Sequence, residues 1–441
     1  MLRDAAEKLV AYLEERFTPS EPKTIEETEL DAGFLSELLL KNLYLRVTGM
    51  GADLAEELGL PFTGVVDQLI EILRRDRLAD VRGGASVSPA SYQLAITNEG
   101  RLRARELMER SQYIGFAPVT LKKYVEAVRA QSFTGAAISE ELIRHGLSHL
   151  VFNSRVIGQV GPAVNSGRAM FLHGNPCNGK TALATAIAGI LPGYIYLPYA
   201  ITADSSIIKT FDAHNHQIVV EKESDDQRRA GLRSGKRYDR RWTHIRRPAV
   251  IVGGELAMAS LDFVFDPVTK THEAPYQMKA NGGMFLIDDF GRQQMRPRDL
   301  LNRWIMPLER RVDYLTLNNG KKIEVPFDSL IIFSTNLDPK DLVDEAFLRR
   351  IPHKILIPDP GFEEFREIFK RNCAQYKIPY DERMLAYLLQ EHYVKAKKPL
   401  RAVHPRDILQ QLSDIARFRR IRPALSRELI DEACRNYFLK Y

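Results

Sequence analysis

The sequence predicts an α/β protein: a parallel five-stranded sheet with helices, a mixed domain of helices and strands before it, and a helical domain after it. Five short apolar runs alternate with helical patterns, which is typical of strands buried on both faces of a parallel sheet. A glycine-rich segment separates the first run from a stretch of good helix formers. Beyond residue 360, apolar residues recur at helical spacing. The five runs are residues 170–173, 194–197, 249–252, 284–287 and 330–335.

The overall composition is that of an ordinary globular protein. The 441 residues are enough for two to four domains, and 44% of them are hydrophobic and 27% charged. The net charge of +6 is compatible with nucleic-acid binding without being evidence for it. The three cysteines, Cys177, Cys373 and Cys434, are far apart and odd in number, so neither a disulfide framework nor a zinc cluster is expected.

Two stretches bear on localisation. The first 17 residues carry acidic side chains throughout and indicate an amphipathic helix rather than a signal peptide. The most apolar long stretch, residues 182–201, is interrupted by Pro192 and Gly193, which indicates a buried helix followed by a buried strand. We therefore expect a cytoplasmic protein without membrane insertion.

Changes of pattern along the chain divide it into four parts. Residues 1–115 show three helical patterns, two strand-like segments around a turn at Gly83 and Gly84, and a further helix, which together predict a winged-helix domain. A linker is expected over 116–134, the α/β domain over 135–357, and the helical domain over 358–441. The α/β domain is expected to contain a basic insertion at about 217–248.

The residues at the start of the third helix of the expected winged-helix domain indicate which kind of partner the domain binds. Its start offers Thr63, Gly64, Asp67 and Gln68, and no Lys or Arg precedes Arg74. Acidic residues there repel phosphate. Docking of a protein is therefore favoured over DNA, which stays open as the alternative.

The glycine-rich segment fits a phosphate-binding loop. Gly174, Gly179, Lys180 and Thr181 match the pattern G-x-x-x-x-G-K-[ST] between a strand and a helix. In such a loop, backbone N–H groups surround a triphosphate, the lysine neutralises its outer phosphates and the threonine hydroxyl binds Mg²⁺. The candidate nucleotide-binding residues are Gly174, Asn175, Pro176, Cys177, Asn178, Gly179, Lys180, Thr181 and Ala182.

A second pair of candidate residues ends the strand at 284–287. Asp288 and Asp289 follow four apolar residues, and the carboxyl end of a strand is where an α/β sheet places its ligand site. We expect Asp288 to help hold Mg²⁺ and Asp289 to activate the attacking water as a general base.

These residues resemble the AAA+ ATPases over about 300 residues, from 135 onward. Gly174 to Thr181 is similar to the Walker A motif of that family, and Leu286 to Asp289 to Walker B. The resemblance implies three further roles: Asn336 orients water, Arg350, with Arg349 beside it, acts as an arginine finger, and Arg406 senses nucleotide at the start of a helix. It also places Ile157 and Gly158 beside the adenine.

The resemblance implies ATP and Mg²⁺ as cofactors and a ring-shaped homo-oligomer, most simply a hexamer, because the arginine finger serves the neighbouring subunit. It favours chaperone-like remodelling of a protein partner, with a DNA-binding ATPase or regulator as the alternative. The stretch around Asn319-Gly320 is similar to a hairpin of MoxR-type and enhancer-activator ATPases, which faces the ring pore. The alternative is a hairpin that only adds to a sheet and has no role in the pore. End to end, the chain is similar to chaperone-type ATPases associated with Flp pilus assembly.

Two features depart from the family pattern. Asp289 stands where the family usually has Glu, and its shorter side chain is expected to hold water less well and to slow hydrolysis. The spacing from Lys180 to Asp288 is longer than a simple core needs, and the surplus is the arginine-rich segment at 217–248. That segment either contacts a substrate through arginines and aromatics or is a solvated surface insertion, which is the favoured interpretation.

Overall fold

The protein is described by a computed structural model that covers residues 16–82, 92–134, 138–219 and 238–438. The turn at Gly83 and Gly84, nearly all of the amphipathic helix expected over the first 17 residues, and the arginine-rich core of the basic insertion lie outside these residues. Within them, no helix combines the length and apolar character needed to cross a membrane.

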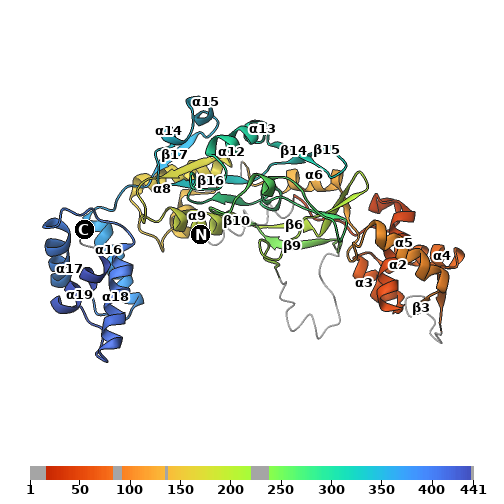
Figure 1. Cartoon of the computed structure of the whole chain (residues 1–441), viewed down its shortest axis with the longest axis horizontal. Helices are drawn as coiled ribbons and strands as arrows, with labels where there is room; N and C mark the ends of the chain where they lie inside the picture. Colours follow the sequence, from red (N-terminus) through yellow and green to blue (C-terminus); the bar gives the residue numbers. More distant parts are fainter. Residues whose placement is uncertain (1–15, 83–91, 135–137, 220–237, 439–441) are drawn as a thin grey trace.

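A five-stranded parallel sheet forms the centre of the molecule and confirms the predicted α/β class (Figure 1). Its strand order is β10-β13-β16-β5-β17, and every neighbouring pair is parallel. β5 (Met170–His173), β10 (Ala249–Val252), β13 (Met284–Ile287) and β16 (Leu330–Thr335) are four of the five expected runs.

The fifth strand of this sheet is not the expected one. The run at 194–197 forms β6 (Tyr194–Pro198), which pairs antiparallel with β9 (Trp242–Arg246) outside the parallel sheet. Its place is taken by β17 (His353–Leu356) at the sheet edge. Because β17 buries only one of its four residues, it lacks the continuous apolar run by which the inner strands are recognised.

Helices cover both faces of the parallel sheet. Alternate strand residues point to opposite faces: Met170, Leu172 and Ile332 pack with α8 (Ser154–Ser166) and α9 (Lys180–Ile190). Phe171, Phe333 and Trp304 pack on the other face beside α12 (Pro297–Arg303) and α13 (Ile305–Arg310). The shorter elements of this domain are α7 (Glu140–Gly146), η4 (Met258–Leu261), α11 (Tyr276–Lys279), α14 (Pro339–Leu342) and α15 (Glu345–Leu348).

A second, mixed sheet lies beside the first and contains the expected linker. Its order is β11-β12-β8-β7-β4. Residues 116–134 are built into it as β4 (Val119–Thr120) and α6 (Leu121–Ala130), whose Tyr124 is fully buried. The other strands are β7 (Ala200–Ala203), β8 (Ser206–Lys209), β11 (Val264–Asp266) and β12 (Thr271–Glu273).

The expected hairpin around Asn319-Gly320 is present as β14 (Val312–Thr316) and β15 (Lys322–Pro326). Its tip is held against the β7–β8 turn, because Asn319 and Lys321 both donate hydrogen bonds to Asp204. Its pore-facing role stays a prediction.

The described end of the basic insertion belongs to the folded core. Arg241 is 1% exposed, and its guanidinium pairs with Asp239 at 2.7 Å and donates to the carbonyl oxygens of Thr28 and Pro118. Trp242 is also buried. This part is therefore structural rather than a solvated surface insertion; residues 220–237 lie outside the described chain.

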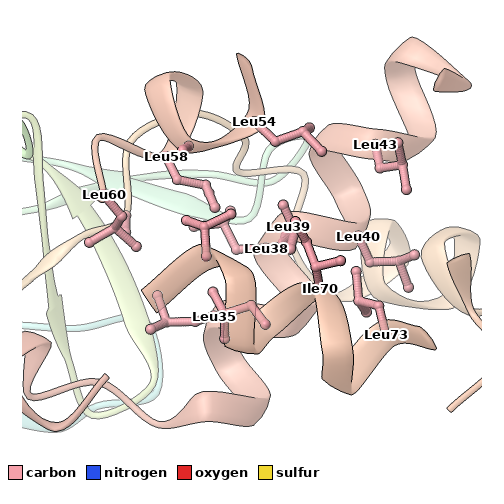
Figure 2. Close-up of a cluster of buried hydrophobic side chains, with 14 of the residues drawn as sticks. Leu35, Leu38, Leu39, Leu40, Leu43, Leu54, Leu58, Leu60, Ile70 and Leu73 are labelled. Atoms are coloured by element: carbon pink, nitrogen blue, oxygen red, sulfur yellow. The ribbon is translucent and has the colours of Figure 1, made fainter. Parts of the chain in front are cut away.

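The N-terminal part combines helices with a three-stranded antiparallel sheet of order β1-β3-β2. Leucines of its long helix α2 fill the core shown in Figure 2. The third helical segment, α4, begins at Asp67; Thr63 and Gly64 shortly before it have non-helical backbone angles. The elements are η1 (Glu26–Thr28), α2 (Ala32–Arg46), β1 (Thr48–Met50), α3 (Gly51–Leu58), η2 (Phe62–Val66), α4 (Asp67–Arg75), β2 (Ala79–Val81), β3 (Gln93–Ile96) and α5 (Asn98–Arg110).

The helical domain lies at the opposite end of the molecule from the N-terminal part (Figure 1). Its core gathers Phe365, Phe369, Leu388, Leu412 and Ile430. Its elements are α16 (Phe362–Gln375), α17 (Glu382–Leu389), η5 (Gln390–Val394), α18 (His404–Phe418) and α19 (Arg427–Tyr437).

Candidate nucleotide-binding site

The loop from Gly174 to Gly179 joins β5 to α9, as the sequence pattern requires. Gly174 has φ 138°, and a Cβ there would lie 2.3 Å from the carbonyl oxygen of Ile357. Gly179 has φ 86° and caps the start of α9. Only glycine fits both positions without strain, so the backbone of the loop is shaped by its glycines.

Lys180 is folded into the loop. Its ammonium donates hydrogen bonds to the carbonyl oxygens of Gly174 at 3.0 Å and Asn175 at 2.9 Å, and to Oδ1 of Asn336 at 2.7 Å. Burial lowers the pKa of Lys180, while the carboxylates of Asp289 and Asp288 oppose that shift. A lysine ammonium beside a glycine-rich loop at the start of a helix favours the binding of an anion.

The two residues expected to hold Mg²⁺ are in direct contact. The hydroxyl of Thr181 donates to Oδ2 of Asp288 at 2.8 Å. These are hard oxygen ligands, and Mg²⁺ is typically held by one or two protein oxygens together with water and phosphate. The chemistry of the pair therefore fits Mg²⁺. No cluster of three or more His, Cys, Asp or Glu side chains suited to a metal occurs in the described parts of the chain.

Asp289 and Asn336 form the second half of the site. The side-chain amide of Asn336 donates to Oδ1 of Asp289 at 3.0 Å, while its oxygen accepts from Lys180. The strand order explains why Asn336 contacts both residues, because β16, which leads to Asn336, lies between β5 and β13. Asp289 itself has φ 49°, a strained angle for a residue other than glycine, and strain of this kind is common at functional sites.

The two candidate arginine-finger residues follow α15. Nε of Arg350 donates to Glu309 on α13 at 2.6 Å. The side chain of Arg349 is 80% exposed and lies 3.8 Å from Glu345. Both arginines therefore pair with acids of their own region.

A cavity of about 330 Å³ lies between the loop and the helical domain. Arg406 lines it, as do the loop residues Cys177 and Asn178. Ile157 and Gly158, expected beside the adenine, lie within α8 and are not among its lining residues; the preceding segment, 149–152, lines it instead. The other lining residues are Gly179, Ala182, Ile368, Arg371, Asn372, Gln375, Ala402 and Val403.

Asp359 and Arg401 were not found from the sequence. Asp359 accepts hydrogen bonds from the amides of Asn178 at 2.6 Å and Asn175 at 3.1 Å, and it forms an ion pair with Arg401. The backbone N–H of Val403 donates to the carbonyl oxygen of Cys177 at 3.0 Å. We name this set the Asp359 clasp. It joins the loop at 174–179 to the helical domain, and no motif or periodicity in the sequence signals it.

A family described as a domain of unknown function (DUF8689) matches residues 361–436, within the helical domain. No curated protein sequence matches the chain.

Several solved structures match parts of the chain at low similarity. A structure of NtrX from Brucella abortus is 15% identical with a TM-score of 0.40, over 68% of this chain and 57% of that one. NtrX in complex with ATP is 14% identical with a TM-score of 0.37, over 85% and 65%. A RuvB mutant from Thermotoga maritima is 10% identical with a TM-score of 0.37, over 65% and 70%. The chain thus spans less than two thirds of either NtrX structure, and similarity at this level assigns it no activity.

Proposed function

We propose that this chain is an AAA+ ATPase that binds MgATP at the loop between β5 and α9 and couples hydrolysis to the remodelling of a protein partner. One observation carries the proposal: three neighbouring strand ends bring Lys180, Thr181, Asp288, Asp289 and Asn336 into one hydrogen-bonded set. Each of these side chains has a chemical use in phosphoryl transfer to water, and their convergence is what such a reaction requires.

The chain's residues divide the work. The N–H groups of the loop and the start of α9 surround the phosphates, and Lys180 exchanges its contacts with the loop carbonyl oxygens for the outer phosphates. Asp289 accepts the proton of the attacking water, and Asn336, already bonded to Asp289, orients that water. Thr181 and Asp288 would hold Mg²⁺, which neutralises phosphate charge when bound.

We further propose that the active unit is a ring, most simply a hexamer, in which Arg350, with Arg349 beside it, serves the site of the next subunit. A guanidinium near the outer phosphates stabilises the charge that develops during transfer. Arg349 is well exposed, and a hydrogen bond to Glu309 positions Arg350. The side chain of Arg350 is 26% exposed, so Arg350 would exchange its contact with Glu309 for the phosphates bound by a second copy of the chain.

Mixing of inactive variants tests the ring and the shared site together. Lys180→Met removes the phosphate ligand, and Arg350→Ala removes the finger. If each site uses one residue from each of two subunits, a one-to-one mixture should recover about one quarter of wild-type ATPase activity, since half of the subunits retain each residue. No recovery in a mixture shown to co-assemble would reject the shared site.

For the N-terminal part we propose a winged helix that docks a protein. α4 begins with Asp67, and the guanidinium of Arg74 is paired with Glu71 at 2.6 Å, so this helix offers little net positive charge. A pull-down with Asp289→Asn, which should bind ATP without hydrolysing it, tests the proposal. Recovery of nucleic acid alone would make the DNA-binding alternative the better account.

A further inference from the structure

The end of α18 and the loop that leads to α19 carry an unusual surface. Residues 417–422, which we name the α18–α19 tip, contain four arginines and no acidic residue. Phe418 is 89% exposed and Ile421 is 47% exposed. Two exposed apolar side chains among four arginines form a surface suited to a partner that offers both negative charge and apolar area.

The tip projects away from the nucleotide site. α18 begins where Val403 contacts the phosphate loop, and the ring of His404 at this end lies 5.4 Å from that of Phe438 just beyond α19. The two helices are therefore antiparallel, and the loop that joins them lies at their far end, in the helical domain of Figure 1. The 15 residues of α18 span about 22 Å.

The turn itself is ordered. Arg420 has φ 58°, and the N–H of Ile421 donates to the carbonyl oxygen of Ala416 at 3.0 Å. This is the hydrogen-bond pattern by which a helix ends in a left-handed residue. Phe418 and Ile421 are consequently presented by a defined backbone.

Most of the positive charge on the tip is not neutralised. Arg419 pairs with Glu428 and Glu432. Arg417, Arg420 and Arg422 are exposed, and no described residue supplies a carboxylate to any of them. The tip thus offers three guanidinium groups around two apolar side chains.

We propose that the α18–α19 tip docks the protein onto the surface of an anionic lipid bilayer. The three arginines bind lipid phosphates, and Phe418 and Ile421 enter the boundary between headgroups and acyl chains. A single nucleic-acid strand favours a groove with successive aromatic side chains on which its bases stack. The tip instead projects from a helix pair, and it has one aromatic side chain and one aliphatic side chain, which cannot stack with a base. A fluid bilayer accommodates a projecting tip without a preformed pocket.

Flotation of the full-length chain with vesicles tests the proposal. The chain should float with phosphatidylcholine vesicles that contain about 30% phosphatidylglycerol, and not with phosphatidylcholine alone. Arg420→Glu combined with Arg422→Glu should weaken binding by about thirtyfold or more, since each lost positive charge near an anionic surface costs about fivefold. Phe418→Ser with Ile421→Ser should weaken it by about tenfold at unchanged charge.

Two controls separate this surface from other effects. Arg435→Glu reverses one charge, half the change of the double variant, at an exposed position on α19 away from the tip and should retain most of the binding. Lys180→Met should bind vesicles like the wild type, so a failure of the proposed ATPase activity would leave this result intact. Equal binding to neutral and anionic vesicles, or tip variants that bind like the wild type, would overturn the proposal. So would tip-dependent binding of single-stranded DNA without vesicle binding.

Discussion

Removing the carboxylate of Asp359 should loosen the contact between the loop at 174–179 and the helical domain. Asp359 accepts from Asn178 and Asn175 and pairs with Arg401, so one side chain joins residues from both sides. In Asp359→Ala, all three partners lose their shared acceptor. The helical domain should then open from the loop more often.

The burial of these groups sets the free-energy change that Asp359→Ala causes in this opening. Asn178 is 2% exposed, so leaving its amide without an acceptor costs about 1–3 kcal/mol. The ion pair between Asp359 and Arg401 is partly exposed, and its loss adds about 1 kcal/mol. The sum of about 2–4 kcal/mol corresponds to an opening equilibrium that is about 30- to 1000-fold more favourable.

Hydrogen exchange at the amide of Val403 measures this opening directly, because that N–H donates to Cys177 across the same contact. Asp359→Ala should accelerate its exchange about 30- to 1000-fold, while the buried amide of Ile332 in β16 should change far less. Asp341→Ala, at an exposed position on α14, is the matched control. Unchanged protection of Val403 in Asp359→Ala would refute the argument.

Three further predictions concern the loop, the base and a histidine. Gly174→Ala should destabilise the fold by at least about 2 kcal/mol in thermal unfolding, because the added Cβ would meet the carbonyl oxygen of Ile357. Gly189→Ala, at an open position on α9, should instead stabilise the fold by about 0.5–1 kcal/mol. Asp289→Glu should raise the ATPase rate severalfold, since the longer carboxylate reaches further towards water; an unchanged or lower rate would show that Asp289 is already well placed. Burial, helped by a nearby arginine, lowers the pKa of His404 to about 4. The pKa of His404 in the folded state is therefore below its unfolded value of about 6.5, so the free energy of unfolding should fall as pH drops from about 6.5 to 4. Urea denaturation should show a smaller fall in His404→Gln.

The parallel sheet was predictable where strands are buried on both faces. β13 and β16 are continuous apolar runs, and a short run of this kind between helical patterns is typical of a central strand of a parallel sheet. β17 was missed because an edge strand needs only one buried residue. β6 was assigned to the wrong sheet because its partner, β9, lies about fifty residues later and carries polar side chains.

In the candidate site, too, residues in local sequence motifs were predictable, whereas contacts between residues far apart in the sequence were not. The glycines of the loop and the acids after β13 follow from local pattern, because backbone geometry and strand ends fix their positions. The bond from Asn336 to both Lys180 and Asp289 was not visible in any local pattern, since it depends on β16 lying between two other strands. The Asp359 clasp joins residues more than 180 positions apart, and only the folded chain brings them together.

The central claim is that Lys180 holds the phosphates of ATP for hydrolysis. Its most direct test is the rate of phosphate release from MgATP by the wild type and by Lys180→Met, with nucleotide binding followed in parallel. The wild type should hydrolyse MgATP, and the variant should lose at least about a hundredfold in activity together with most of its affinity. A variant that hydrolyses MgATP as fast as the wild type would contradict the account.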